Sequence, residues 1–215
     1  MSKTIPDKLT NFLQMMLPER NELLRKIEQE CQEDYIPLVA PETGQFLQVM
    51  VEAFKPKRIL EVGTGIGYST ILMATTGDGW ERHITTIEID TTRYARACQN
   101  FRDAQIADIV NPLLGNASDI IPTLTDNYDF VFMDAAKGQY PDFFSKVWPL
   151  LNSRAMLVID NVFLNGWVID MTWPERRKKT MVCRVRDLLE TLKKHPELAT
   201  SLIPLGDGLA VSVRR

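Results

Sequence analysis

Three oxygen-bearing side chains stand directly after two apolar segments of the sequence. Asp134 follows residues 130–133, and Asp160 and Asn161 follow residues 157–159. If both segments are strands of one parallel sheet, their carboxyl ends meet at the same edge, where the ligands of open α/β sheets bind. Carboxylate and amide oxygens with no Cys or His beside them favour a hard cation such as Mg²⁺. The alternative is that each acid caps a helix.

Lys137 lies three residues after Asp134, in the loop that would overlook this metal site. Alanines at 135 and 136 leave the lysine room to turn inward. Next to a divalent cation, a lysine can lose its proton and serve as a general base. The alternative is a surface lysine that forms an ion pair with Asp134 or Asp160.

Glycines at 63, 65 and 67 follow a short apolar segment over residues 58–62. A strand that runs through glycines into a helix brings backbone N–H groups close to a ligand, and the missing Cβ atoms allow the ligand to approach. This spacing favours a nucleotide-type cofactor. The dinucleotide fingerprint would place its third glycine where Tyr68 stands, which disfavours an NAD(P)-dependent oxidoreductase. Glu61, two residues before the first glycine, would suit a cationic amino-acid end of the cofactor.

Polar residues also end the next two predicted strands. Glu88 and Asp90 close the segment 84–89, and a carboxylate there can accept both hydroxyls of a ribose. We assign this role to Glu88, because Asp90 is better placed to cap the following helix. The segment 109–114 ends at Gly115, and the polar Asn116 and small Ala117 after it would suit an adenine ring.

Strands and helices alternate from residue 58 onward, which predicts an α/β fold with a parallel sheet covered by helices on both faces. The predicted strands span 58–62, 84–89, 109–114, 128–134 and 155–160, and the helices between them span 67–76, 91–104, 117–121 and 140–150. A long charged helix over 174–195 follows. The apolar runs 202–205 and 209–213, joined by Gly206-Asp207-Gly208, predict an antiparallel hairpin. The prediction is therefore a mostly parallel, seven-stranded sheet with a C-terminal antiparallel hairpin.

Extra helices precede this core. Residues 7–35 have helical spacing interrupted by Pro18, and a further helix over 42–54 could be capped by Glu42 or Thr43. Their apolar stripes predict packing against another helix or a second subunit, and hence a homodimer. We expect a single domain over 1–215, with N-terminal helices in 1–54 and the core in 55–215.

Composition excludes several classes of protein. The 215 residues are 45% hydrophobic and 25% charged, as in ordinary globular proteins, and the net charge of −3 gives no general attraction to nucleic acid. Three widely spaced cysteines make a zinc site improbable and indicate a reducing cytoplasm. No apolar run reaches the roughly 18 residues of a membrane span, and the segment that includes Lys3 and Lys8 does not have the pattern of a secretory signal.

The glycine motif resembles the first motif of S-adenosylmethionine-dependent methyltransferases. Together with residues 134–140, Asp160-Asn161 and residues 204–208, it resembles the cation-dependent O-methyltransferase family, which includes catechol and caffeoyl-coenzyme A methyltransferases. The resemblance runs from about Pro37 to the end of the chain, and it implies a Rossmann-like class I methyltransferase fold. The sequence has Ala136 and Asn116 where many members have Asp.

The resemblance also implies roles for individual residues. Asp134, Asp160 and Asn161 would hold the metal, and Lys137 would be the catalytic base. The S-adenosylmethionine site would comprise Val39, Glu61, Gly63, Gly65, Tyr68, Ser69, Glu88, Asn116, Ala117 and Asp134. The metal would bind two adjacent substrate oxygens and acidify a hydroxyl, whose oxyanion attacks the sulfonium methyl group in line.

Chelation requires a substrate with vicinal oxygens, which both a catechol and 5-hydroxyuridine provide. Residues 134–140, 160–162, 176–179 and His195-Pro196 resemble the bacterial branch that methylates 5-hydroxyuridine at the wobble position of tRNA to 5-methoxyuridine. The basic run 176–179 suggests phosphate contacts, although charge runs often mark only a solvated helix face. We therefore expect a tRNA substrate, with a small catechol-like phenol as the alternative. A non-catalytic RNA-binding module is disfavoured by the complete set of Lys137 and metal ligands.

Overall fold

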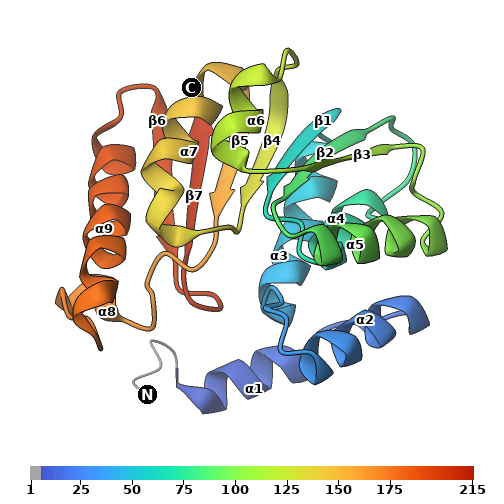
Figure 1. Cartoon of the computed structure of the whole chain (residues 1–215), viewed down its shortest axis with the longest axis horizontal. Helices are drawn as coiled ribbons and strands as arrows, with labels where there is room; N and C mark the ends of the chain where they lie inside the picture. The colour runs from blue at the N-terminus through green and yellow to red at the C-terminus, as the bar shows by residue number, and fades with distance from the viewer. Residues whose placement is uncertain (1–5) are drawn as a thin grey trace.

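A computed structural model describes residues 6–215 of the chain (Figure 1). Lys3, considered above with Lys8, lies outside these residues. The helices are α1 (Asp7–Met15), α2 (Glu22–Glu33), α3 (Pro41–Phe54), α4 (Tyr68–Ala74), α5 (Thr91–Asp103), α6 (Ala117–Ile120), α7 (Tyr140–Val147), α8 (Trp167–Asp170) and α9 (Lys179–Lys194). Short 3₁₀ turns are η1 (Ile121–Thr123), η2 (Lys137–Gln139), η3 (Trp148–Leu150) and η4 (Arg176–Lys178). No helix within 6–215 has the length and apolarity that a bilayer span requires.

The strands form one seven-stranded sheet in the order β3-β2-β1-β4-β5-β7-β6. They are β1 (Arg58–Val62), β2 (His83–Glu88), β3 (Val110–Leu114), β4 (Tyr128–Met133), β5 (Leu151–Ile159), β6 (Leu198–Ile203) and β7 (Leu209–Arg214). The first five pair in parallel, and β7 pairs antiparallel to both β5 and β6. This confirms the predicted fold class. The strand order reverses between β1 and β4, and ligands of such sheets bind at the carboxyl ends beside the reversal.

Successive side chains of the central strands alternate between the two faces of the sheet, and helices bury both faces. Ile59 and Phe130 pack into one hydrophobic cluster with residues of α2, α3, α4 and α5. Leu60 and Val131 pack into a second cluster with residues of α7 and α9. The apolar runs of β1 and β4 therefore hold two helical layers against one sheet, and they fix the strand ends that form the site.

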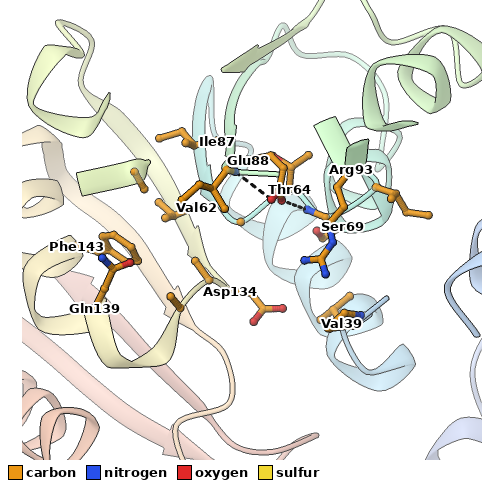
Figure 2. Close-up of a pocket in the computed structure, with 18 of the residues that line it drawn as sticks. Val39, Val62, Thr64, Ser69, Ile87, Glu88, Arg93, Asp134, Gln139 and Phe143 are labelled. Atoms are coloured by element: carbon orange, nitrogen blue, oxygen red, sulfur yellow. Dashed lines mark hydrogen bonds between the residues drawn. The ribbon is translucent and has the colours of Figure 1, made fainter. Parts of the chain in front are cut away.

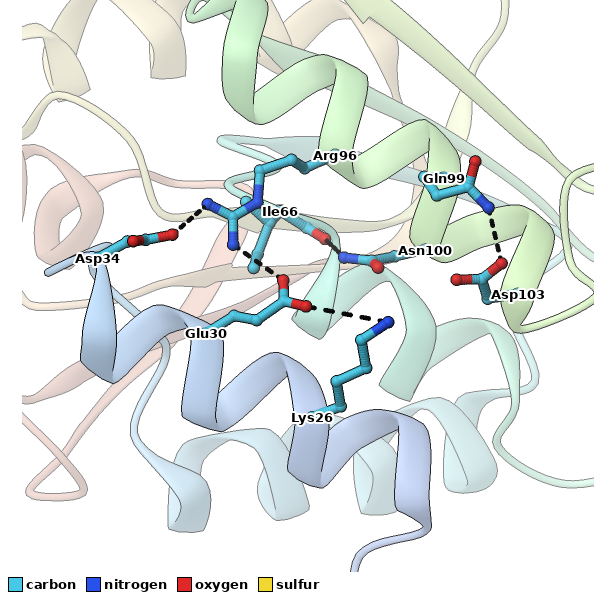
Figure 3. A network of polar contacts seen from close by, with 8 residues as sticks. All are labelled: Lys26, Glu30, Asp34, Ile66, Arg96, Gln99, Asn100 and Asp103. Atoms are coloured by element: carbon cyan, nitrogen blue, oxygen red, sulfur yellow. Dashed lines mark hydrogen bonds and ion pairs between the residues drawn. The ribbon is translucent and has the colours of Figure 1, made fainter.

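The helix α2 packs into the core through an apolar stripe and is joined to α5 by ion pairs. Leu24, Ile27 and Cys31 are buried on the face that packs into the core. Figure 3 shows Arg96 of α5 between Glu30 and Asp34, with N···O distances of 2.8 and 2.7 Å. The stripe of α2 thus packs within the chain, as predicted, whereas α1 has no buried residue.

The start of α3 differs from the prediction. The helix begins at Pro41, whose fixed φ suits a first helical position, and Ala40 precedes it without a side-chain cap. Glu42 is instead buried and accepts a hydrogen bond from Gln14 Nε2 at 3.1 Å. Thr43 is also buried, and its hydroxyl has no partner within residues 6–215. Neither residue caps the helix.

Other boundaries also shift. β5 begins at Leu151 rather than 155, because an irregular register opposite Tyr128 and Phe130 carries polar residues into the strand. The hairpin strands are joined by five residues, 204–208, rather than by a three-residue turn, since β6 ends before Pro204, which has no N–H to donate. The first three residues of the basic run, 176–178, precede α9 and form a 3₁₀ turn after the extended Glu175, and α9 itself begins at Lys179.

Candidate active site

A cavity of about 320 Å³ opens at the carboxyl ends of β1, β2 and β4 (Figure 2). Its volume is at the lower end of the range for small-molecule sites. The predicted cofactor residues that line it are Val39, Gly63, Gly65, Tyr68, Ser69, Glu88, Asn116, Ala117 and Asp134. The fold therefore gathers into one cavity residues that lie as far apart in sequence as 39 and 134. Their role as cofactor ligands stays a prediction.

Glycine is favoured at positions 63 and 65 of the loop after β1 for different structural reasons. Gly63 has a φ of +101°, and a Cβ there would lie 2.0 Å from the carbonyl oxygen of Asp134. Glycine therefore lets the end of β1 pass close to the end of β4. Gly65 has a φ of +57°, yet a Cβ there would meet nothing within 4 Å, so its backbone borders open space in the cavity.

Glu88 ends β2 with its carboxylate held by the backbone. Its Oε2 accepts a hydrogen bond from Gly65 N at 2.8 Å. Its Oε1 accepts hydrogen bonds from the N–H groups of the next two residues at 3.0 and 2.9 Å. Asp90 caps α5 by accepting from Thr92 N and Arg93 N, each at 2.9 Å, which confirms the capping role predicted for it. Glu88 lines the cavity as a fixed anionic acceptor.

Glu61 does not face the cavity, unlike the other predicted cofactor residues. It lies on the same face of β1 as Ile59, so its side chain points toward α4 and is fully buried. Its carboxylate accepts hydrogen bonds from Ser69 Oγ at 2.5 Å, from Thr86 Oγ1 at 2.6 Å and from the Thr70 hydroxyl. Burial raises its pKa to about 7. The expected direct contact with a ligand is replaced by support of Ser69, which does line the cavity.

The outer wall of the cavity comes from the N-terminal part of the chain and from α4. Val39 belongs to the connection between α2 and α3, which lines the cavity together with Pro37 and Leu38. The Tyr68 hydroxyl accepts a hydrogen bond from Arg20 Nε at 3.1 Å and donates one to Glu28. These contacts fix the tyrosine ring beside the cavity and attach α2 to the site.

The adenine-side residues sit at the start of α6. Asn116 Oδ1 accepts a hydrogen bond from Ser118 N at 2.9 Å and thereby caps the helix. Its oxygen is therefore occupied by the protein, while the residue still lines the cavity beside the buried Ala117.

The predicted metal ligands stand at the adjoining ends of β4 and β5. The two strand ends are joined by a hydrogen bond from Asp160 N to Met133 O at 3.0 Å. Lys137 Nζ lies 2.5 Å from Asp134 Oδ1. The Asn161 N–H donates to Asp160 Oδ1 at 2.6 Å, and Asn161 itself has a φ of +57°. The sequence prediction of a shared edge is therefore matched by the geometry.

The ionised form of Asp160 is disfavoured in this region. Asp160 is only 1% exposed. Burial, and then the charge of Asp134, raise the pKa of Asp160 to about 8, while Lys137 opposes the shift. A divalent cation between the carboxylates would relieve this repulsion.

The donor chemistry can be compared with what a cation requires. Within residues 6–215, no three residues drawn from His, Cys, Asp and Glu form a cluster suited to a metal ion. The predicted trio has only two carboxylates, and its third member is the amide of Asn161. Two carboxylates and one amide oxygen fit a hard cation such as Mg²⁺, which usually completes its coordination with water and substrate oxygens. Metal binding by these residues stays a prediction.

Several lining residues were not among the predicted site residues. Arg93 of α5, Gln139 of η2 and Phe143 of α7 border the cavity. Arg93 follows the helix cap Asp90 by three residues, and that spacing was the one available signal of its position. Tyr140, whose hydroxyl donates to Asp160 O at 3.0 Å, ended the motif 134–140 without a role being assigned to it.

Comparison with known proteins gives consistent matches. The family described as O-methyltransferase matches residues 14–215. The catechol O-methyltransferase of Niastella koreensis is 33% identical over 178 residues, which cover 79% of this chain and 79% of that protein. The crystal structure of the O-methyltransferase from Bacillus cereus in complex with SAH has a TM-score of 0.86 and 26% identity, with 97% of each chain covered. A second crystal structure is that of the O-methyltransferase TomG from Streptomyces achromogenes, involved in tomaymycin synthesis, in complex with SAM. It has a TM-score of 0.84 and 29% identity, with 96% of each chain covered.

Proposed function

Because the chain belongs to the O-methyltransferase family and is an S-adenosylmethionine-dependent enzyme, we propose that it methylates a hydroxyl that has a second oxygen beside it. Asp134, Asp160 and Asn161 would hold a divalent cation such as Mg²⁺. The observation that carries this proposal is the meeting of two repelling carboxylates and Lys137 at adjoining strand ends, beside a cavity lined by the glycine loop and Glu88. A bound cation would stabilise the deprotonated form of a hydroxyl that ligates it.

The chain's own groups account for the remaining steps. Glu88 would accept the ribose hydroxyls, and Ser69 and the glycine loop would orient the methionine end of the cofactor. Lys137 lines the same cavity and keeps about a quarter of its side chain exposed, so it can turn from Asp134 toward a substrate hydroxyl. Its ammonium would first release a proton to solvent, and the neutral amine would then accept the proton of the hydroxyl. Val39 and Tyr68 would exclude water from the cofactor side. Alignment of the reacting oxygen with the methyl group is then the main contribution to the rate.

We infer that the substrate is 5-hydroxyuridine at the tRNA wobble position. Residues 167–186 carry six Lys or Arg and two Asp or Glu, a net charge of +4 in a chain whose net charge is −3. Within them Trp173 is 36% exposed, and Lys179 Nζ lies 5.1 Å from its ring centroid. Arg184 Nη1 donates to Gly138 O at 3.0 Å, which places this basic segment beside the Lys137 loop. Basic groups with an exposed aromatic ring suit the phosphates and unstacked bases of an RNA loop.

A small catechol-like phenol is the second candidate substrate. It satisfies the same chelation requirement, and the relative from Niastella koreensis carries the name catechol O-methyltransferase. The two candidates differ in the surface that they need, since a phenol would make no use of the basic segment 176–179.

The decisive experiment compares methyl transfer from S-adenosylmethionine to tRNA that bears unmethylated 5-hydroxyuridine and to a catechol, with and without a chelator. We expect transfer to tRNA that is lost on chelation and restored by added Mg²⁺. Transfer confined to the catechol would select the second candidate. Activity that survives thorough chelation would overturn the metal proposal.

The role of Lys137 is tested by Lys137→Ala, with Lys146→Ala as the control. Removal of a general base lowers kcat by about 10² to 10⁴. Lys146 pairs with Asp142 on the surface of α7 and should tolerate replacement. Turnover by Lys137→Ala at the wild-type rate would show that another group removes the proton.

We also propose a homodimer and a cytoplasmic location. On α1 and at the residue that follows it, Phe12, Met15 and Met16 are 55%, 80% and 68% exposed, and a helix face of this kind suits burial against a second copy. Light scattering should give a dimer for the wild type and a monomer for Phe12→Glu, while a wild-type monomer would exclude the assembly. The free thiols Cys31, Cys98 and Cys183 suit a reducing compartment, and fractionation of cells would test the location.

A further inference from the structure

The turn between β6 and β7 folds onto the loop that follows β5. Val162 N donates to Gly208 O at 3.0 Å, and Phe163 N donates to Asp207 O at 3.0 Å. The carboxylate Oδ1 of Asp207 accepts a third hydrogen bond, from Asn165 N at 2.7 Å. The turn 204–208 therefore holds the backbone of the loop that begins with Asp160 and Asn161.

This loop has an unfavourable backbone conformation. Asn161, Leu164 and Asn165 have φ values of +57°, +50° and +55°. Non-glycine residues in this region cost free energy and persist where the surrounding structure holds them. At Gly208 a Cβ would lie 2.3 Å from the Phe163 ring, so the glycine allows the turn to pack closely against the loop. The contacts with the turn offset the local strain.

Asp207 also faces the charged groups of the site. After burial, the charges of Asp134 and Asp207 raise the pKa of Asp160, and Lys137 lowers it. Lys137 likewise lowers the pKa of Asp207, which burial raises. The Asp207 carboxylate thus interacts electrostatically with Asp160 and Lys137 in addition to its hydrogen bond to Asn165 N. Asp207 is not among the residues that line the cofactor cavity.

We propose that Asp207 is a positioning residue whose carboxylate, through its hydrogen bond to Asn165 N, fixes the loop that presents Asp160 and Asn161 to the cation. This inference rests on the cation of the proposed function. Asp207 acts through the loop and is not a catalytic residue. Its removal should therefore impair metal binding and leave the cofactor cavity intact, because the cavity is built from β1, β2, β4 and the connection before α3.

The test uses the full chain without substrate and measures Mn²⁺ binding and SAH binding by calorimetry. Loss of an outer-shell partner typically weakens metal binding by about 10- to 100-fold, and we expect this for Asp207→Ala with SAH affinity unchanged. Asp207→Asn keeps an oxygen that can accept from Asn165 N, so it should stay close to the wild type. Asp187→Ala, which removes an exposed acid from α9, is the matched control and should change neither affinity.

Hydrogen exchange supplies a readout that needs no metal. The Asn165 amide should exchange faster in Asp207→Ala than in the wild type and remain protected in Asp207→Asn.

Each contrary outcome has its own meaning. Wild-type Mn²⁺ affinity in Asp207→Ala would overturn the inference and leave the proposed function standing. Parallel loss of Mn²⁺ and SAH affinity would show a general structural role and overturn it as well. An equal loss in Asp207→Asn would overturn the hydrogen-bond route. A wild-type protein that binds no Mn²⁺ would instead refute the metal in the proposed function, and the inference with it.

Discussion

Glu61 and Glu88, at the carboxyl-end side of β1 and β2, each accept three hydrogen bonds from hydroxyl or backbone N–H groups. Asp134 and Asp160, which follow β4 and β5, each accept one within residues 6–215. The half of the site that we assign to the cofactor thus carries acids that several donors of the protein hold in place. In the half that we assign to the metal, burial and then the charge of Asp134 raise the pKa of Asp160 to about 8.

This contrast indicates how each half would bind its ligand, the cofactor in one half and a divalent cation in the other. The glycine loop, Glu88 and Ser69 are fixed by internal hydrogen bonds, so they can receive a ligand with little rearrangement. The carboxylates of Asp134 and Asp160 have Lys137 as the nearby cation that opposes their repulsion. A divalent ion would supply the missing positive charge. The variants below probe one half at a time, beginning with the largest expected effect.

Asp160→Asn should break the metal half alone. Loss of a charged ligand removes several kcal/mol of electrostatic stabilisation, so we expect kcat to fall about a thousandfold. The affinity for S-adenosylmethionine should not change, because Asp160 does not line the cofactor cavity. Methyl-transfer kinetics and calorimetry would measure the two quantities, with Asp142→Asn as a surface control. A matched loss of cofactor affinity would contradict the separation of the two halves.

Glu88→Gln should break the cofactor half alone. The glutamine NH₂ group would oppose at least one of the N–H donors that now bind the carboxylate. A charged hydrogen-bonded contact is worth about 2 kcal/mol, so the affinity for S-adenosylmethionine should fall about 30-fold. Mn²⁺ affinity should stay at the wild-type value. Asp90→Asn, which retains a capping oxygen, is the matched control, and equal affinities in all three proteins would exclude the ribose role.

Glu61→Gln tests the buried acid of β1 through the pH dependence of the free energy of unfolding. The folded pKa of Glu61 is about 7, above the unfolded value near 4.5, so between these values the folded chain retains a proton that the unfolded chain has lost. Wild-type stability should therefore fall as pH rises toward 7 and then level off, by about 3 kcal/mol between pH 5 and 8 relative to the variant. Denaturant unfolding at several pH values measures this difference. Parallel pH profiles of the two proteins would contradict the assignment.

Arg96→Ala should have the smallest effect, since Arg96 lies outside both halves of the site. Its ion pairs with Glu30 and Asp34 are partly exposed, with 31% and 56% of the two acidic side chains accessible. Such pairs contribute less than about 1 kcal/mol, which lowers the Tm by about 2–4 °C. Calorimetric scanning would show this shift while cofactor and metal affinities stay constant. A change in cofactor affinity would instead reveal that α2 controls the cavity (Figure 3).

Much of the site could be predicted because its residues stand at strand ends. Buried parallel strands are short apolar runs, and the polar residue that ends each run lies at the ligand edge of the sheet. This reasoning placed Gly63, Glu88, Asp134 and Asp160 at that edge, and the structure agrees. It also assigned the cap of α5 to Asp90 and not to Glu88.

Other features depended on contacts between distant segments. Glu61 belongs to the same motif as Gly63, yet the alternation of side chains along β1 turns it toward hydroxyls of α4 and β2. The role that we propose for Asp207 depends on β7 lying beside β5, which brings the turn 204–208 onto the loop after Asp160. Periodicity in the sequence contains no information on such pairings.

The sequence by itself determined the fold class, the family and the edge of the sheet where chemistry would occur, because strand periodicity and short motifs are local properties of the chain. The tertiary structure alone decided which acids are satisfied and which remain in repulsion. That distinction depends on how deeply each carboxylate is buried and on which donors reach it, and both are set by the packing of segments far apart in the sequence.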